Sequence, residues 1–163
     1  MQRVLVLGCS GTGKSVLARR LGERTGLPVI HLDQHYWFQG WTALDGPSWR
    51  ARVAELTAQP AWIMDGNHPH SLPRRLAVAD TVILLDLPAW RCLARVLRRQ
   101  IRFYGRVRPD MAAGCPERFD WDFMHYIWNF RKQRLPGIRA ALETFEGRTV
   151  LLKSSREIAG FNG

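Results

Sequence analysis

A glycine-rich segment near the start of the chain constrains the fold more than any other feature. Residues 8–15 read Gly-Cys-Ser-Gly-Thr-Gly-Lys-Ser, which matches the phosphate-binding pattern G-x-x-x-x-G-K-S, the P-loop. The apolar run 4–7 before it is typical of a buried parallel strand, and Val16, Leu17 and Leu21 after it mark the apolar side of a helix. A glycine-rich turn that matches by chance is the alternative, but strand, loop and helix all fall in register here.

The residue types in this segment suit a nucleoside triphosphate with Mg²⁺. Its three glycines let the backbone curve so that N–H groups face phosphate oxygens, and the helix N-terminus behind them adds about half a positive charge. Lys14 supplies a mobile cation for the β- and γ-phosphates, and Ser15 supplies a hydroxyl for the metal. We therefore expect ATP and Mg²⁺ as cofactors. The expected nucleotide-binding residues of the segment are Gly8, Ser10, Gly11, Thr12, Gly13, Lys14 and Ser15.

Composition limits the class of protein. With 163 residues, 46% of them hydrophobic, we expect residues 1–163 to form a single domain with a core of its own. No apolar run approaches the roughly 20 residues that a membrane helix needs, and no signal-peptide pattern opens the chain, so no membrane partner is expected. Cys9, Cys92 and Cys115 stand in separate contexts, which predicts neither a disulfide framework nor a zinc site. A reducing cytoplasm is the expected location.

The charge balance points to an anionic partner. The formal net charge is +10 and the isoelectric point is near 10.7, and arginine, which suits bidentate phosphate contacts, carries most of the excess. Nucleotides, phosphorylated metabolites and nucleic acid all qualify. The charge taken alone also fits a simpler role in solubility with weak nonspecific affinity.

Four further apolar segments predict strands, and helical patterns separate them. This alternation predicts an α/β fold of three layers, with a five-stranded parallel sheet and helices on both faces. Ligands of such sheets bind beyond the carboxyl ends of the strands. The four segments are residues 29–33, 61–65, 81–86 and 149–152.

Three of these predicted strands end in an acid, and two of those acids, Asp33 and Asp65, are candidates for the site. Asp33 is placed to orient or deprotonate an acceptor hydroxyl, or to assist the metal, and it equally suits a cap for the next segment. Asp65 takes the position at which P-loop enzymes keep the acid that holds the water shell of Mg²⁺. The turn Gly66–Asn67 follows at once, and Asn67 is expected to contact the substrate.

Residues 34–60 are expected to form an acceptor-binding insertion. Aromatic residues crowd its first part, where they would either wall a planar acceptor or form a small satellite core. A helix is predicted to begin at Asp45–Ser48, with a proline in its first turn. Arg50 lies off the apolar stripe of that helix and is a candidate acceptor contact. The crowded aromatic residues are Tyr36, Trp37, Phe38 and Trp41.

The segment after residue 88 predicts a long helix with two stripes. One is apolar, as in a packed amphipathic helix, and the other is made of arginines that repel one another. No acid lies between Asp86 and Asp110, so we favour phosphate binding over a solvated basic face, with Arg95 and Arg99 on the nucleotide. The apolar stripe is Trp90, Leu93, Leu97, Ile101 and Tyr104; the basic stripe is Arg91, Arg95, Arg98 and Arg102, with Arg99 beside it.

Residues 105–118 are expected to form a lid. The segment is punctuated by glycine and proline, lacks periodicity, and carries Arg106, Arg108 and Arg118. A mobile loop with arginines excludes water on closing and brings positive charge to the transferred group. A plain surface connector is the alternative. The apolar pattern that follows predicts a helix over residues 117–134 with two apolar faces.

The order of these motifs resembles the nucleoside-monophosphate kinase fold, of which adenylate kinase is the type. Asp65-Gly66 resembles the start of that family's acceptor motif, and Leu85-Asp86-Leu87-Pro88 resembles its segment after strand four. The resemblance implies that Arg95 and Arg99 bind phosphate ahead of the lid. The chain departs from it at Pro69, where adenylate kinase has an arginine that holds the acceptor's phosphate. Arg75 is the candidate replacement.

A second set of motifs is similar to the DNA topology modulation proteins, adenylate-kinase-related P-loop proteins of about this length. That resemblance implies an effect on DNA supercoiling and does not specify a reaction. The motifs that carry it are His31-Leu32-Asp33, Trp37 with Gly40-Trp41, Trp62-Ile63 with Asp65-Gly66-Asn67, Arg75-Leu76 with Ala79-Asp80, and Gly114-Cys115-Pro116-Glu117-Arg118-Phe119.

Together these features predict an ATP-binding phosphotransferase that moves the γ-phosphoryl group of ATP to a nucleotide or another small acceptor. The alternative is an ATP-binding, nucleic-acid-associated protein that affects DNA topology, whose basic surface binds nucleic acid nonspecifically. The expected catalytic residues are Lys14, Asp33, Arg95 and Arg99. The expected substrate-binding residues are Asp33, Arg50, Asn67, Arg75, Arg108 and Arg118, and the expected Mg²⁺ site uses Ser15 and Asp65.

Overall fold

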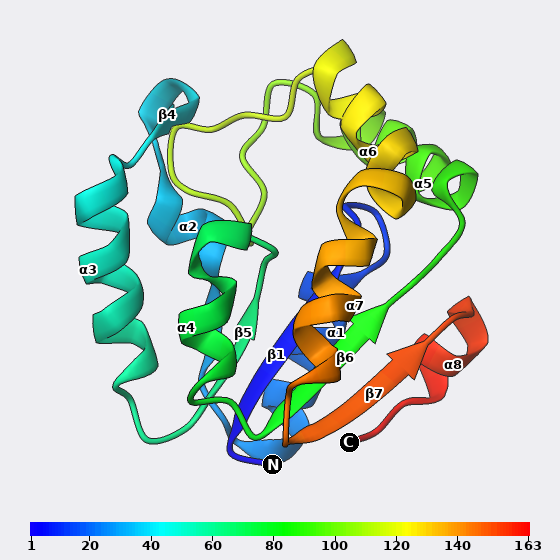
Figure 1. Cartoon of the computed structure of the whole chain (residues 1–163). Helices are drawn as coiled ribbons and strands as arrows, with labels where there is room; N and C mark the ends of the chain where they lie inside the picture. The colour runs from blue at the N-terminus through cyan, green and yellow to red at the C-terminus, as the bar shows by residue number, and fades with distance from the viewer.

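Five parallel strands form the central sheet, in the order β2–β5–β1–β6–β7 (Figure 1). The computed structural model describes residues 1–163. The predicted parallel sheet of five strands is confirmed, with bounds that differ from the predicted ones by a few residues. The strands are β1 (Arg3–Gly8), β2 (Val29–His31), β5 (Trp62–Asp65), β6 (Thr81–Leu85) and β7 (Arg148–Leu152).

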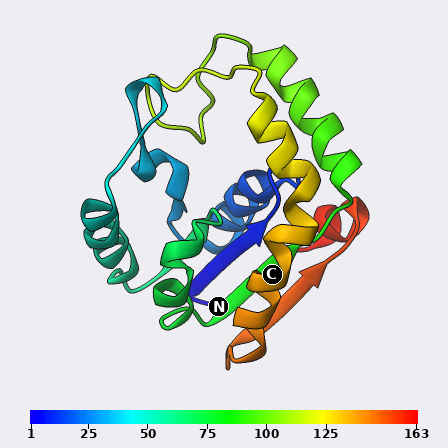
Figure 2. The same ribbon diagram turned by 45° about the horizontal axis from the view of Figure 1, so that its top comes forward.

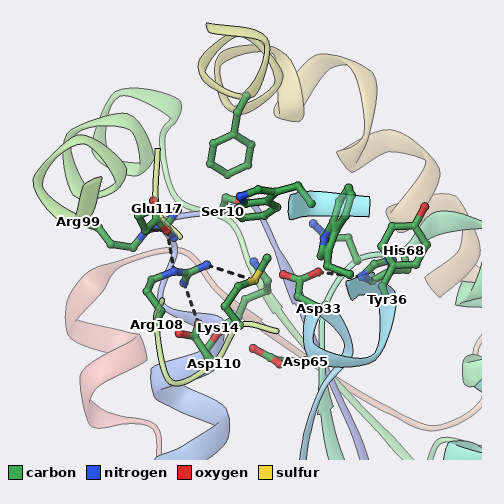
Figure 3. A pocket seen from close by; sticks show the side chains of 18 of the residues that line it. Ser10, Lys14, Asp33, Tyr36, Asp65, His68, Arg99, Arg108, Asp110 and Glu117 are labelled. Carbon is green, nitrogen blue, oxygen red and sulfur yellow. Dashed lines mark hydrogen bonds and ion pairs between the residues drawn. The ribbon is translucent and has the colours of Figure 1, made fainter. Parts of the chain in front are cut away.

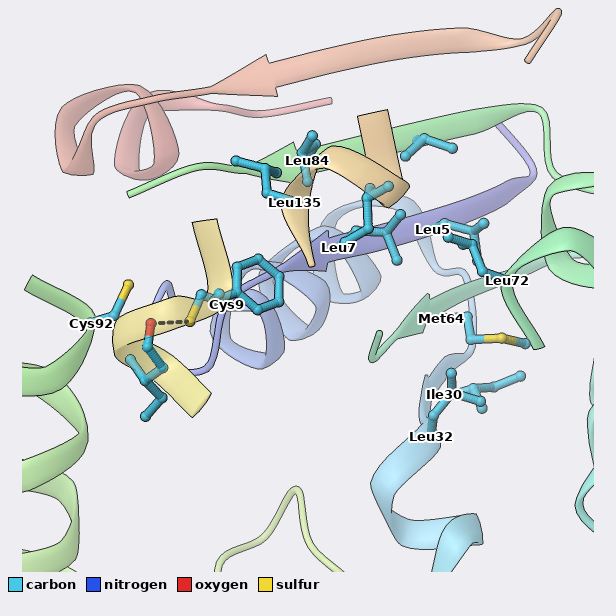
Figure 4. Close-up of a cluster of buried hydrophobic side chains, with 14 of the residues drawn as sticks. Leu5, Leu7, Cys9, Ile30, Leu32, Met64, Leu72, Leu84, Cys92 and Leu135 are labelled. Carbon is cyan, nitrogen blue, oxygen red and sulfur yellow. Dashed lines mark hydrogen bonds between the residues drawn. The ribbon is translucent and has the colours of Figure 1, made fainter. Parts of the chain in front are cut away.

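Helices cover both faces of this sheet because its central strand is apolar on both sides. Val4 and Val6 of β1 pack with α1 (Lys14–Thr25), and α8 (Ser155–Gly160) lies beside α1. The alternate residues Leu5 and Leu7 pack into the larger cluster on the opposite face (Figure 4). That face is covered by α3 (Gly46–Thr57), α4 (Leu72–Leu76), α5 (Ala89–Phe103), α6 (Trp121–Gln133) and α7 (Leu135–Glu143).

Residues 105–118, the segment predicted to be a lid and called the lid below, lie against the first part of the predicted insertion. Figure 2 shows the lid arching from α5 and α6 over to a short antiparallel hairpin. The backbone N–H of Gly40 donates to the carbonyl of Gly114 at 2.9 Å, and the indole of Trp41 donates to the carbonyl of Pro116 at 3.2 Å. The small elements of this region are α2 (Leu32–Tyr36), β3 (Trp37–Phe38), η1 (Gln39–Trp41) and β4 (Thr42–Ala43). A further short element, η2 (Pro69–Ser71), directly precedes α4.

A satellite core joins the lid to the hairpin. Buried lid residues, with Cys115 almost fully enclosed, pack against Trp37 and Trp41. The Sγ of Cys115 also donates to the carbonyl of Phe38 at 3.0 Å. Two of the crowded aromatic residues therefore pack as a satellite core, and they line a cavity as well.

Most of the apolar stripe of α5 lies on the surface, although Leu93 packs against the core. Ile101 is 81% exposed and Tyr104 is 72% exposed, whereas Cys92 and Val96 are fully buried. The reason lies in the P-loop, because a Cβ on Gly11 would come within 2.4 Å of the Cys92 carbonyl. Such close packing turns the small side of α5 inward and leaves most of its large apolar residues on the surface.

The helix predicted over residues 117–134 begins four residues late, so that bound is wrong. Asp120 caps α6 by accepting a hydrogen bond from the N–H of Phe123 at 3.1 Å. Glu117 instead lies near the end of the lid, where its backbone forms hydrogen bonds with the backbone of Gly105 and Arg106 at the start of the lid. The second predicted apolar face is only partly buried, since Met124 lies in the core whereas Trp121 is 77% exposed. None of the helices combines the length and apolar content needed to cross a bilayer.

Candidate active site

A cavity of about 1240 Å³ lies at the carboxyl edge of the sheet, and 36 residues line it. The chain leaves β1 for α1 on one face and leaves β5 for α4 on the other. Neighbouring strands whose connections diverge in this way open a crevice between their carboxyl ends. The P-loop and the Asp65–Asn67 turn border that crevice, and residues of α2, α3, α5, α6 and the lid line the rest of the cavity. Figure 3 shows Lys14 and Asp65 on this edge, with Arg99 and Arg108 beside them.

The P-loop backbone is shaped for close contacts. A Cβ on Gly8 (φ 141°) would lie 2.4 Å from the carbonyl of Leu85, so only glycine fits there. Gly13 adopts φ 100°, and a Cβ there would meet nothing within 4 Å, so the space beside it is open. Thr12 is fully buried, and its hydroxyl donates to the carbonyl of Cys9 at 2.7 Å. Gly8 and Thr12 thus hold the loop internally, whereas Ser10, Gly11, Gly13, Lys14 and Ser15 line the cavity.

The Lys14 ammonium group folds over this loop. Its Nζ donates to the carbonyl of Cys9 at 3.0 Å. Asn67 clamps the other end of the loop, since its amide oxygen accepts from the N–H of Gly8 at 3.1 Å and its amide nitrogen donates to the Gly8 carbonyl at 2.9 Å. The expected substrate contact Asn67 therefore lines the cavity and also fixes the start of the P-loop.

The two candidate acids, Asp65 at the end of β5 and Asp33 on α2, each pair with a histidine. Asp65 is buried, and its Oδ1 lies 2.7 Å from Nδ1 of His31. Burial opposes protonation of His31, but the hydrogen bond and charge of Asp65 outweigh it and raise the pKa of that histidine. Asp33 lies on α2, and its Oδ1 is 2.9 Å from Nε2 of His68. Burial acts to raise the pKa of Asp33, but His68 and the nearby cations lower it below the ordinary value.

The donors around Ser15 fit Mg²⁺ bound together with a nucleotide. No three His, Cys, Asp or Glu side chains gather into a metal site of their own. Mg²⁺ usually takes one or two protein ligands and completes its shell with phosphate oxygens and water. The Ser15 hydroxyl at the start of α1 and the buried carboxylate of Asp65 both line the cavity and are the residues that would hold it.

Arginines from α5 and the lid converge on the cavity from the side opposite Asp33. Arg95 donates to the P-loop carbonyls of Gly11 and Thr12 at 3.4 and 3.2 Å. Arg99 and Arg108 form ion pairs with one oxygen of Glu117, at 2.9 and 2.6 Å from their Nε atoms. This grouping brings three of the expected phosphate contacts to one wall.

The remaining expected substrate contacts divide into two groups. Arg50 and Arg118 line the cavity, and the guanidinium of Arg118 lies 5.8 Å from the ring centroid of Trp41. Arg75 is fully buried and does not line the cavity. Burial lowers its pKa to about 9, so it stays charged at neutral pH, and it donates to the carbonyls of Gly66, Asn67 and His68. A guanidinium occupied in this way is not free to bind an acceptor.

Several polar residues of the cavity were not among the sequence-based site residues, and Glu117, His68 and Asp110 are three of them. Glu117 was assigned to a predicted helix. Asp110 pairs with Arg108 at 2.9 Å and lies beside the Ser15 hydroxyl. Burial acts to raise the pKa of Asp110, but Arg108 and Ser15 lower it. Its signal was present in the sequence, as the first acid after a long stretch of arginines.

Comparison with known proteins yields one relative by sequence and many by structure. No protein-family model matches the chain. The uncharacterized protein YqaC of Bacillus subtilis (strain 168) is 31% identical over 108 residues, which is 64% of this chain. The match spans 60% of YqaC, less than two thirds of its length.

Similar solved structures include two shikimate kinases and a gluconokinase. Shikimate kinase from Acinetobacter baumannii, in complex with shikimate, gives a TM-score of 0.60 at 17% identity, covering 95% of this chain and 84% of that one. A gluconokinase from Sinorhizobium meliloti 1021 gives 0.55 at 16% identity, covering 99% and 87%. A shikimate kinase from Bacteroides thetaiotaomicron gives 0.54 at 14% identity, covering 97% and 92%. At these identities the likeness shows the fold, which is that of the P-loop small-molecule kinases.

Proposed function

We propose that this protein is an ATP-dependent phosphotransferase that transfers the γ-phosphoryl group of ATP to a small-molecule acceptor. The observation that carries the proposal is the convergence of three cations from three elements on one cavity. Lys14 comes from the P-loop helix, Arg99 from α5 and Arg108 from the lid. Phosphoryl transfer needs little more than such positioning and charge stabilisation.

The cavity has two ends that suit the two substrates. The P-loop backbone would bind the triphosphate of ATP, and Ser15 and Asp65 would hold the Mg²⁺ that balances its charge. Arg95 bridges the P-loop and α8, where its Nη2 donates to the hydroxyl of Ser155 at 2.9 Å. The acceptor enters beside Asp33 and Arg50 under the closed lid, which excludes water.

Radiolabelled ATP provides the test. Wild-type protein incubated with [γ-³²P]ATP and Mg²⁺ is expected to release or transfer labelled phosphate, and the Lys14→Ala variant is expected to lose at least a hundredfold in rate. EDTA should abolish the activity. Equal rates for the two proteins, or wild-type turnover that is indifferent to EDTA, would contradict the proposal. The matched control is Lys153→Ala, because Lys153 is exposed and does not line the cavity.

The surface of α5 supports a second candidate, the nucleic-acid-associated protein suggested by the resemblance to DNA topology modulation proteins. Arg91, Arg98 and Arg102 form no ion pair with any acid, and two exposed apolar residues adjoin them in the sequence, Trp90 next to Arg91 and Ile101 next to Arg102. Arginines with interleaved apolar side chains suit a phosphate backbone with stacked bases. The candidate predicts DNA affinity that falls with salt by a log–log slope near 0.9 per phosphate contacted; affinity independent of salt would dismiss it.

A further inference from the structure

His68 and Asp33 form a polar pair at the acceptor end of the cavity (Figure 3). Nε2 of His68 lies 2.9 Å from Oδ1 of Asp33. The imidazole ring sits against Tyr36 and Trp49, with ring centroids 4.7 and 4.9 Å away. The histidine side chain is largely buried, whereas that of Asp33 is 48% exposed and faces the cavity. One carboxylate oxygen is therefore engaged, and Oδ2 makes no hydrogen bond within the protein.

The backbone that carries His68 is held in an unusual conformation. His68 has φ 32°, in the left-handed region that residues other than glycine rarely adopt. The fully buried Arg75 donates hydrogen bonds to three successive carbonyls there, at Gly66, Asn67 and His68. Strained backbone persists where the surroundings fix it, and it is concentrated at functional sites. The fold thus supplies a buried cation whose contacts all go to the segment that positions this histidine.

We propose, on the basis of the phosphotransferase function above, that the acceptor is an alcohol whose hydroxyl binds Oδ2 of Asp33, with His68 as the residue that positions this carboxylate. In the transfer step the hydroxyl oxygen forms a bond to the γ-phosphorus. The bond from the γ-phosphorus to the bridging oxygen breaks, and its electron pair leaves with ADP. The hydroxyl proton passes to Oδ2 of Asp33 and then to solvent, while the N–H of His68 keeps donating to Oδ1.

The charges around Asp33 favour an alcohol over a nucleoside monophosphate. An acceptor phosphate carries negative charge at neutral pH and would meet the ionised carboxylate of Asp33 at close range, where like charges repel. The arginine expected to hold such a phosphate, Arg75, is occupied by backbone carbonyls. A hydroxyl is neutral and donates a hydrogen bond, which is what a free carboxylate oxygen accepts best.

Four proteins and three kinds of acceptor test this inference. The proteins are wild type, Asp33→Asn, His68→Leu and His68→Gln, the last of which keeps an N–H donor for Asp33. ATP affinity should agree within about twofold in all four, which shows that each folds and binds nucleotide. Transfer from [γ-³²P]ATP is then measured to polyols, sugar acids and hydroxylated ring acids, to AMP, CMP, GMP and UMP, and to water alone.

The inference predicts turnover with an alcohol or water and none with the monophosphates. Asp33→Asn should lose at least a hundredfold in kcat. His68→Leu should lose about tenfold in kcat at unchanged KM for ATP, and His68→Gln should recover to within about threefold of wild type. Without His68, only the charges of Lys14 and Arg108 act to lower the pKa of Asp33, so that pKa should rise. The acid limb of the pH–rate profile should therefore move to higher pH in His68→Leu.

The contrary results separate this inference from the function it rests on. A nucleoside diphosphate formed from any of the monophosphates would overturn the inference and leave the phosphotransferase proposal standing. So would an unchanged rate of transfer or hydrolysis in Asp33→Asn, or an equal loss of kcat in both His68 variants. ATP binding by the wild type without turnover of any acceptor, water included, would contradict the phosphotransferase proposal as well. Failure of the wild type to bind ATP would overturn both.

Discussion

Replacing Glu117 with glutamine is expected to weaken the fold and to tighten ATP binding at the same time. Glu117 is buried, and its Oε1 lies 2.9 Å from Nε of Arg99 and 2.6 Å from Nε of Arg108. Glutamine keeps the shape of the side chain and removes the negative charge that both guanidinium groups face. The variant therefore isolates the charge of Glu117 from its packing.

The magnitude follows from the distance between the two cations. Both Nε atoms contact one oxygen, so they lie within about 5.5 Å, where two unit charges at an effective dielectric constant of about 20 repel by about 3 kcal/mol. Both arginines keep some exposure to the cavity, and solvent screening reduces this value. We expect the unfolding free energy to fall by about 2 kcal/mol. The same uncompensated charge attracts the triphosphate, and about 1.4 kcal/mol of added attraction tightens the ATP Kd about tenfold.

Urea unfolding and calorimetric titration with Mg·ATP measure the two effects. Glu55→Gln is the matched control, because Glu55 also pairs with an arginine at 2.9 Å but lies exposed on α3. Its unfolding free energy should stay within about 0.5 kcal/mol of wild type, with unchanged ATP affinity. The reasoning is refuted if Glu117→Gln is as stable as wild type, or if it binds ATP more weakly.

Three further predictions concern the residues around the P-loop. Burial would raise the pKa of Asp33, but the hydrogen bond from His68 helps to lower it, so ionised Asp33 stabilises the fold above about pH 4 and this contribution is lost as the pH falls further. The stability difference between wild type and Asp33→Asn should shrink over that range; a constant difference would count against the pairing. Arg75→Met leaves three carbonyls without their donor and should cost about 2–4 kcal/mol in urea unfolding, against less than about 0.5 kcal/mol for the exposed Arg74→Met. Asn67→Leu removes two hydrogen bonds to the P-loop backbone and should weaken ATP binding about tenfold by calorimetry, and unchanged affinity would argue against the clamp.

The features that were predictable from sequence have local signals. The strands are short apolar runs, the start of α3 carries its capping residue Asp45, and α1 ends at Gly26, which adopts φ 72° as its position suggests. The P-loop was predictable for the same reason, because its sequence pattern specifies both the path of the backbone and the strand and helix on either side.

The orientation of α5 was not predictable from its own periodicity. Its large apolar residues form a regular stripe, and that regularity usually marks the buried side. Here the close approach of Gly11 to the Cys92 carbonyl admits only small side chains, so a contact between distant segments decides which side faces inward.

The polar pairs of the cavity depend on such distant contacts as well. Glu117 meets Arg99 only because the lid folds back on α5, and His68 meets Asp33 only because the chain after β5 returns to α2. Spacing along the sequence holds no trace of either pair. Arg75 was predicted to contact the acceptor, but its side chain turns into the protein and binds backbone carbonyls instead. Nothing about its position in the sequence indicated this.

The central claim is that the P-loop and the lid enclose one nucleotide between them, and hydrogen–deuterium exchange with and without Mg·ATP tests it most directly. Exchange is expected to slow both in residues 8–15 and in residues 105–118, while β7 and α7 keep their rates. Protection confined to the outer face of α5, or no change in the P-loop at saturating Mg·ATP, would contradict it.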